Sequence, residues 1–209
     1  YGAKTETPML LAVGRLVARK GYMSLLRAMP LILKEHQNAR LVIVGRGHMK
    51  KSLLKAAEEL GVAHAVFIKS GMPFEELAQH YRSADLVVYP SYYEGQGLIP
   101  LEALASGTPV VTVDQPPLTE MVDDTVGGLF DRGDYSGMAK AVCDELNGSV
   151  KRIKKAKAGR KRVLNLLHSK VTLKHTKISS NAQCKSATGE ISEPAHRARY
   201  HMCEVFRLL

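Results

Sequence analysis

The feature of this sequence that most constrains its fold is the alternation, through residue 147, of short apolar segments with longer segments of helical periodicity. Each short segment holds three to five almost wholly apolar residues, the pattern of a strand that is buried on both faces of a sheet. The predicted strands are 9–13, 41–44, 66–68, 86–89 and 110–113. Strands separated by helices at this spacing predict βαβ units and a parallel sheet.

Between these segments, apolar residues recur every three or four positions, which predicts helices that cover the sheet. The predicted helices are 22–36, 53–60, one that begins near Pro73, and 98–105. Together these elements indicate an α/β fold with a Rossmann-like, doubly wound parallel sheet. Ligands bind beyond the carboxyl ends of the strands in such sheets, so we expect the site in the segments that follow Val13, Val44, Ile68 and Tyr89.

The formal net charge of +10 is distributed unevenly along the chain. Residues 1–150 hold 15 Lys and Arg against 17 Asp and Glu, whereas residues 151–209 hold 15 against 3. We therefore predict a Rossmann-like domain over 1–150, followed by a basic helix and irregular tail over 151–209. The slightly acidic first part excludes a basic nucleic-acid surface there, and nucleic acid is not expected as a partner.

The tail opens with eight basic residues in twelve, at positions 151–162. This segment predicts an amphipathic helix that Gly159 interrupts, and from Ser169 onward no periodicity is sustained. Three interpretations remain open. The 151–167 segment contacts an anionic membrane surface, it forms a nucleic-acid or nuclear-import patch, or it is a solvated helix followed by disorder, the interpretation we favour.

The sequence also limits where the protein resides. No stretch approaches 18 consecutive apolar residues, so we expect no membrane span. The first residues lack the regions of a signal peptide and are expected to continue a longer chain. The three cysteines show no CxxC spacing, which argues against a zinc site and favours a reducing compartment. We expect a cytoplasmic protein, peripheral at the cytoplasmic membrane face if the 151–167 segment binds lipid.

The loop after the first strand carries the first candidate site. Gly14 and Gly21 bracket a basic loop that leads into a helix, and Arg15 and Lys20 lie within it. Cations beside the free amides of a helix N-terminus form an anion site. The alternative is an exposed loop with ordinary surface cations. The loop after the second strand begins like GxGxxG at Gly45 but lacks the third glycine, which favours an ordinary tight turn.

The segment after the fourth strand carries the strongest signal. Gly95 and Gly97 permit close backbone approach just before a helix, whose first amides would face the crevice. Glu94 precedes this helix, and Glu102 lies about 7–8 Å along it at about 1.5 Å per residue. A pyrophosphate on the amides would place a ribose near Glu102 and the group beyond the phosphates near Glu94. The alternative is a glutamate that only complements the helix dipole.

The motifs GRLVARKG, VIVGRG, FIKSGMPFEEL, DLVVYPSYYEGQGLIPLEALASGTPVV and GGLF, collinear over residues 8–147, resemble the family 4 (GT4) retaining glycosyltransferases. They are similar to the C-terminal, donor-binding half of a two-domain GT-B enzyme, and the Glu-x7-Glu pair is the most specific part. The resemblance implies sugar transfer from a nucleotide-diphosphate sugar to a sugar, polysaccharide or lipid-linked acceptor, with retention of anomeric configuration and neither metal nor cofactor.

The resemblance also implies roles for individual residues. Arg15 and Lys20 would offset charge on the donor diphosphate, Glu94 would lie at the sugar ring and reacting centre, and Glu102 would hold the ribose hydroxyls. Of these four residues, Arg15, Lys20 and Glu94 would be catalytic. The implied donor-binding set is Gly14, Arg15, Lys20, Glu94, Gly95, Gln96, Gly97, Leu98 and Glu102.

The sequence departs from the family pattern at several places. Gln96 stands where Phe is commonest, and the 114–120 segment replaces a GGxxE stretch. An acceptor-binding N-terminal half is absent, so we expect these 209 residues alone to bind donor weakly and not to transfer sugar. Two alternatives are a GT-B-like sugar-nucleotide epimerase, which the Glu-x7-Glu pair disfavours, and a non-catalytic module that binds nucleotide-sugar or polyanions.

Overall fold

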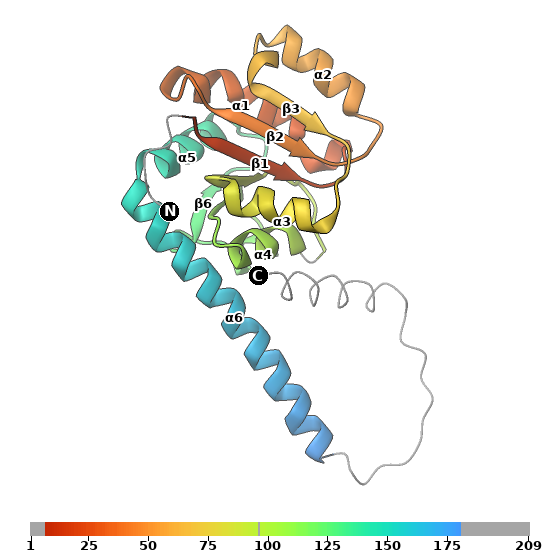
Figure 1. Ribbon diagram of the computed structural model, residues 1–209, viewed down its shortest axis with the longest axis vertical. Coiled ribbons are helices and arrows are strands. Elements are labelled where there is room, and N and C mark those ends of the chain that lie inside the picture. The colour runs from red at the N-terminus through yellow and green to blue at the C-terminus, as the bar shows by residue number, and fades with distance from the viewer. Residues whose placement is uncertain (1–6, 96, 181–209) are drawn as a thin grey trace.

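The computed structural model describes residues 7–95 and 97–180, with side chains up to residue 166. Six parallel strands form one sheet in the order β3-β2-β1-β4-β5-β6 (Figure 1). The strands are β1 (Met9–Val13), β2 (Arg40–Val44), β3 (Val66–Lys69), β4 (Leu86–Tyr89), β5 (Val110–Val113) and β6 (Gly127–Phe130). This order confirms the predicted Rossmann-like, doubly wound α/β fold.

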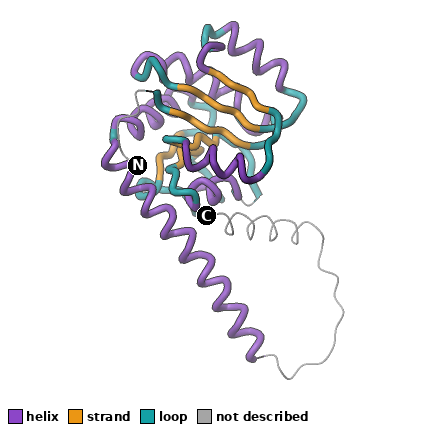
Figure 2. The backbone as a smooth tube through the Cα atoms, viewed as in Figure 1, coloured by secondary structure: helices purple, strands orange, loops and turns teal. Residues whose placement is uncertain are grey.

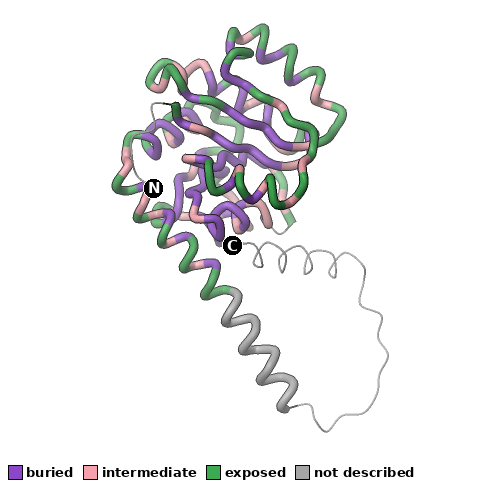
Figure 3. The backbone as a smooth tube through the Cα atoms, in the orientation of Figure 1, coloured by how far each residue is buried: buried purple, intermediate pink, exposed green. Residues whose placement is uncertain are grey.

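Helices alternate with the strands along the chain (Figure 2). They are α1 (Tyr22–Glu35), α2 (Lys50–Glu59), α3 (Phe74–Ser83), α4 (Leu98–Ala105), α5 (Tyr135–Asn147) and α6 (Ser149–Ser180), with 3-10 turns at Ala18–Lys20, Ala63–Ala65 and Leu118–Glu120. The central strands are buried on both faces, and Leu10, Val87 and Val111 are fully buried (Figure 3). This burial explains why the sequences of these strands are continuously apolar and do not alternate between apolar and polar residues.

Strand β6 is an element that the apolar pattern alone did not predict. It opens with Gly127 and Gly128, which lower intrinsic strand propensity. The sheet itself explains Gly127, because a Cβ atom there would lie 1.9 Å from the carbonyl oxygen of Val110 on β5. A close backbone approach therefore requires glycine at a position where strand propensity alone would disfavour it.

The position of the ligand site follows from the strand order. From β1 the chain proceeds to β2 on one side, and later crosses to β4 on the other side, so β1 and β4 flank the point where the winding reverses. The two strands are paired directly, with Leu10 opposite Leu86. This fold usually binds its ligand at such a switch point, beyond the carboxyl ends of the two strands, where their loops lie.

Helix α6 differs from the prediction, since it is continuous through Gly159 and extends to Ser180. Gly159 is a packing residue and not a helix break, because a Cβ atom there would lie 2.6 Å from Cδ2 of the buried Leu104 on α4. Once its first turns are held on the domain, further helical residues are added at low cost. The expected interruption at Gly159 and the expected loss of regular structure from Ser169 are therefore wrong for residues up to Ser180.

The basic residues of α6 divide into two groups. Three reach back to acidic side chains of the sheet domain and fasten the helix to it. These pairs are Arg152 Nη2 with Asp85 Oδ1 at 3.2 Å, Lys155 with Glu145, and Arg162 Nη2 with Asp123 Oδ2 at 2.7 Å. Among the other basic residues of α6 up to residue 166, where side chains are described, Lys151, Lys154, Lys157 and Lys161 are exposed. The first turns of α6 thus pack on the domain, and the division at residue 150 stays a prediction.

Among the described helices, none combines the length and the apolar character that crossing a bilayer requires.

Candidate active site

Two loops meet at the crevice between β1 and β4. The first, residues 14–21, leaves β1, and the second, residues 90–97, leaves β4. The backbone amide of Tyr92 donates to the carbonyl of Arg19 at 2.8 Å, which ties the loops together. Gly21 has φ +69° and caps α1, and a Cβ atom there would lie 2.1 Å from the carbonyl oxygen of Pro90. Only glycine permits both this conformation and this contact.

The side chains of these loops converge on one carboxylate. Lys20 forms an ion pair with Oε1 of Glu94 and donates from Nζ to the Tyr89 hydroxyl at 2.7 Å. The hydroxyls of Tyr89 and Ser91 donate to the same Oε1 atom at 2.6 and 2.5 Å. The Lys20 and Glu94 side chains are only 11% and 13% exposed. The structure therefore joins the two predicted site residues directly across the crevice.

The charge state of this cluster follows from its contacts. Burial alone would raise the pKa of Glu94, but hydrogen bonds from Lys20, Ser91 and Tyr89 outweigh it, and the pKa lies below the ordinary value. Burial and the bond to Glu94 raise the pKa of Tyr89 well above its ordinary range. At neutral pH, Glu94 is an anion and Tyr89 keeps its proton, so the hydrogen bond between them persists.

Glu102 lies in a different environment on α4. Its side chain is buried, with the residue 6% exposed, and Oε2 accepts a 2.8 Å hydrogen bond from the Tyr81 hydroxyl of α3. Burial, and then the nearby Glu102 carboxylate, raise the pKa of Tyr81, which therefore remains a donor. This bond fixes the orientation of the Glu102 carboxylate behind the start of α4.

The remaining predicted residues surround this cluster. Gly97 caps α4 at φ +57°, and Leu98 is the first residue of the helix. Gly95 is exposed, and a Cβ atom there would meet nothing within 4 Å. Gln96 lies outside the described residues. Gly97 is buried, and a Cβ atom there would lie 2.2 Å from Cε of Met121, so only a glycine fits at the start of α4.

At the start of the first loop, Gly14 continues β1, and its amide donates to the Val44 carbonyl at 3.0 Å. Arg15 follows and is exposed. The next amide, of Leu16, donates to the carbonyl of Arg46 at 2.8 Å, which ties this loop to the one after β2. Arg15 therefore lies on the exposed side of the same sheet edge, whereas Lys20 is enclosed.

Sequence reasoning missed the hydroxyl groups of this site. Tyr89 and Ser91 orient Glu94, and Tyr81 orients Glu102, but none was predicted as a site residue. A signal exists for Tyr89, since a hydroxyl at the carboxyl end of a buried strand needs a polar partner. Tyr81 lies on a helix distant in sequence, and only the packing of α3 on α4 brings it to Glu102.

The sheet order places this chain among α/β proteins with a Rossmann-like sheet, whose usual ligand site is the switch point where the Lys20–Glu94 pair lies. A family model described as glycosyl transferases group 1 matches residues 1–162. The chain belongs to this family, which confirms the predicted GT4 resemblance. An epimerase or a non-catalytic module is not favoured.

Individual relatives agree with this assignment. The chain is 43% identical to an uncharacterised glycosyltransferase of Methanocaldococcus jannaschii, over 62% of this chain and 33% of that protein. It is 36% identical to a GDP-mannose-dependent phosphatidylinositol monomannoside mannosyltransferase of Mycolicibacterium smegmatis, over 68% of this chain and 39% of the relative. The chain thus spans well under half of each relative.

A solved structure gives the same result for the fold. The C-terminal domain of a glycosyl transferase group 1 family protein (LpcC) from Francisella tularensis superimposes with a TM-score of 0.68 at 25% identity. The match covers 77% of this chain and 87% of that domain. A separately crystallised C-terminal domain thus corresponds to most of the sheet domain described above.

Proposed function

We propose that this chain holds the donor site of a retaining glycosyltransferase, with a nucleotide-diphosphate sugar bound in the crevice between the 14–21 and 90–97 loops. The observation that carries the proposal is the Lys20–Glu94 pair, which lies across the switch point beside the N-terminus of α4. A cation and the N-terminus of a helix at the same switch point suit a diphosphate.

The arrangement suggests how the residues divide the chemistry. The diphosphate would replace Glu94 as the ion-pair partner of Lys20. Arg15 and the amides of α4 would add positive potential around the diphosphate. Transfer breaks the bond between the anomeric carbon and the phosphate oxygen, forms a bond to the acceptor oxygen, and delivers the acceptor proton to the departing diphosphate. Glu94 would then face the sugar, and Glu102 would hold the ribose hydroxyls. The chemistry that we propose requires neither metal nor cofactor.

The names of the relatives support a nucleotide-sugar donor and a sugar or lipid-linked acceptor. The Mycolicibacterium smegmatis relative is described as using GDP-mannose and phosphatidylinositol monomannoside. The match covers only 39% of that protein, so the proposal for this chain concerns the donor site, and we expect no sugar transfer by these 209 residues alone. A cytoplasmic location is part of the same proposal, since nucleotide sugars are cytoplasmic metabolites.

The test is a binding panel on the 209-residue chain. We expect UDP, GDP or ADP, and the matching nucleotide sugar, to raise the melting temperature, because ligands that bind only the folded state stabilise it. Glu102→Ala should weaken the best ligand about tenfold, the effect of losing one charged hydrogen bond. Glu58→Ala, which removes an exposed carboxylate from α2, serves as the control. Absence of any nucleotide effect would sink the proposal.

A second proposal concerns α6 and a membrane surface. An exposed stripe of four lysines recurs at helical spacing along α6, at Lys151, Lys154, Lys157 and Lys161. The ion pairs that fasten α6 to the domain are made by Arg152, Lys155 and Arg162. Such a stripe suits anionic lipid headgroups. Peripheral binding would bring the donor site to a lipid-linked acceptor.

Flotation with vesicles tests this second proposal. We expect binding to vesicles that contain phosphatidylserine and none to pure phosphatidylcholine, with about 1 kcal/mol from each lysine near the surface. Changing all four stripe lysines to Gln should release the protein. The matched control changes Lys34, Lys51, Lys55 and Lys140 to Gln, which removes the same charge elsewhere. Equal binding by both variants would exclude α6 as the contact.

A further inference from the structure

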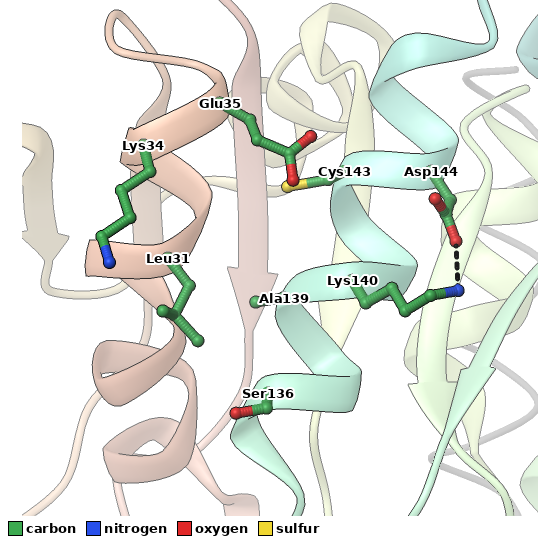
Figure 4. Close-up of a pocket in the computed structure, with 8 residues that line it drawn as sticks. All are labelled: Leu31, Lys34, Glu35, Ser136, Ala139, Lys140, Cys143 and Asp144. Carbon is green, nitrogen blue, oxygen red and sulfur yellow. Dashed lines mark hydrogen bonds and ion pairs between the residues drawn. The ribbon is translucent and has the colours of Figure 1, made fainter.

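A cavity of about 270 Å³ lies between α1 and α5 (Figure 4). Glu35, the last residue of α1, and Cys143 of α5 line it, and the Lys140–Asp144 ion pair closes another side. Helices in a βαβ unit run back from the carboxyl edge of the sheet, so the end of α1 lies at the opposite edge from the donor crevice. The cavity therefore belongs to a different part of the molecule.

Two of the residues that line the cavity, Glu35 and Cys143, form a group of metal-ligating side chains with the neighbouring His36. One ligand atom each of Glu35, His36 and Cys143 lies within 4.8 Å of the other two. The carboxylate of Glu35 lies beside the Cys143 sulfur (Figure 4). Nε2 of His36 is buried and has no hydrogen-bond partner in the described part of the chain. A buried imidazole nitrogen without a partner is costly unless something binds it.

We propose that Glu35, His36 and Cys143 form a zinc site with its fourth position open to the cavity. Sulfur, imidazole and carboxylate are the ligands that Zn²⁺ takes, at about 2.0–2.3 Å. Tetrahedral bonds of these lengths separate the ligands by about 3.3–3.8 Å. Since the ligand atoms lie within 4.8 Å of one another, the side chains have to close by at most about 1–1.5 Å to bind the ion. A thiolate and a carboxylate would together neutralise the divalent ion.

The sequence alone argued against zinc, because it contains no CxxC motif. Glu35 and His36 are adjacent, but Cys143 lies more than 100 residues away, and only the packing of α5 beside α1 completes the group. The ion would join the end of α1 to α5 and so stabilise the domain. The site makes no use of the donor crevice and does not depend on the proposed function.

Cobalt binding by the metal-free 209-residue chain tests the site. We expect one equivalent of Co²⁺ to give a thiolate charge-transfer band and tetrahedral visible bands, with release of about one proton from the thiol. Zn²⁺ should displace it and raise the melting temperature by several degrees. Cys143→Ser should remove the charge-transfer band, and His36→Gln should weaken binding at least tenfold.

The control is the double variant Cys184→Ser, Cys203→Ser, whose positions lie outside the described residues. It should keep the charge-transfer band. Loss of the band in this double variant, or its persistence in Cys143→Ser, would overturn the proposal. Far-UV circular dichroism reports whether each variant is folded. If Cys143→Ser fails to fold, unchanged Co²⁺ affinity in His36→Gln would by itself exclude the site.

Discussion

Replacing Lys20 by Met should weaken binding of the nucleoside diphosphate by about 10- to 100-fold, the range expected when one charge-assisted hydrogen bond to phosphate is lost. Lys20 is the enclosed cation of the crevice and is already held toward it by Tyr89 and Glu94. Calorimetry with the best nucleotide measures the effect. Lys55→Met is the matched control, because it removes one lysine charge from α2, where Lys55 is 76% exposed.

The two variants separate a specific contact from general charge. Lys55→Met should bind nucleotide like the parent, since exposed charges are screened by salt. Equal affinity of Lys20→Met and the parent would remove Lys20 from the donor site. A loss of similar size in both variants would indicate that net charge, and not the position of Lys20, governs binding.

The same variant should change the acid sensitivity of the fold. The pKa of Glu94 in the native state lies below its ordinary value of 4.5, so its carboxylate stabilises the fold above that value. This contribution is lost as the pH falls through the lowered pKa. Without Lys20, a hydrogen bond and a nearby positive charge that lower the pKa of Glu94 are both lost, so its pKa rises relative to the parent. Lys20→Met should therefore begin acid unfolding at higher pH than the parent or Lys55→Met.

The sheet could be predicted because its strands are short, buried and separated by helices. Three strands, β1, β4 and β5, match the predicted bounds exactly in length and position. The sequence pattern mispredicts the structure where the residue type at one position is determined by a contact with a residue distant in sequence. Gly159 was predicted to interrupt a helix and Gly127 lowers strand propensity, yet close approach requires both glycines, to Leu104 on α4 and to Val110 on β5.

For the candidate site, the sequence predicts which loops carry the charged residues but not which of these residues pair. Cations and carboxylates could be placed on the correct loops because parallel strands end at one sheet edge. Their pairing could not, since the Lys20–Glu94 contact depends on how two loops fold over each other. Tyr81, which orients Glu102, was missed because burial gives an aromatic residue the same sequence pattern whether or not its hydroxyl is used. For Tyr89 the signal was its place at the carboxyl end of a buried strand, where a hydroxyl needs a polar partner.

Replacing Gly21 by Ala should disrupt both the fold and the site. A left-handed conformation costs a non-glycine residue about 1–2 kcal/mol. The new Cβ atom would also lie 2.1 Å from the Pro90 carbonyl oxygen, a backbone atom that cannot rotate away. Overpacking of this kind costs about 1–3 kcal/mol more. We therefore expect a total loss of about 3 kcal/mol in the free energy of unfolding, measured by urea denaturation.

Gly61→Ala provides the control, because Gly61 has φ +70° and a Cβ atom there would meet nothing within 4 Å. Gly61→Ala shares the conformational cost and lacks the clash. Its free energy of unfolding should therefore fall by only about 1–2 kcal/mol, and it should bind nucleotide like the parent. In Gly21→Ala, relief of the clash requires the loop that carries Lys20 to move from Pro90, which separates Lys20 from Glu94. Nucleotide affinity should fall with stability. Equal stability of the two variants would show that the Pro90 contact is not rigid. Normal nucleotide affinity in Gly21→Ala would show that the donor site does not depend on the contact between Gly21 and Pro90.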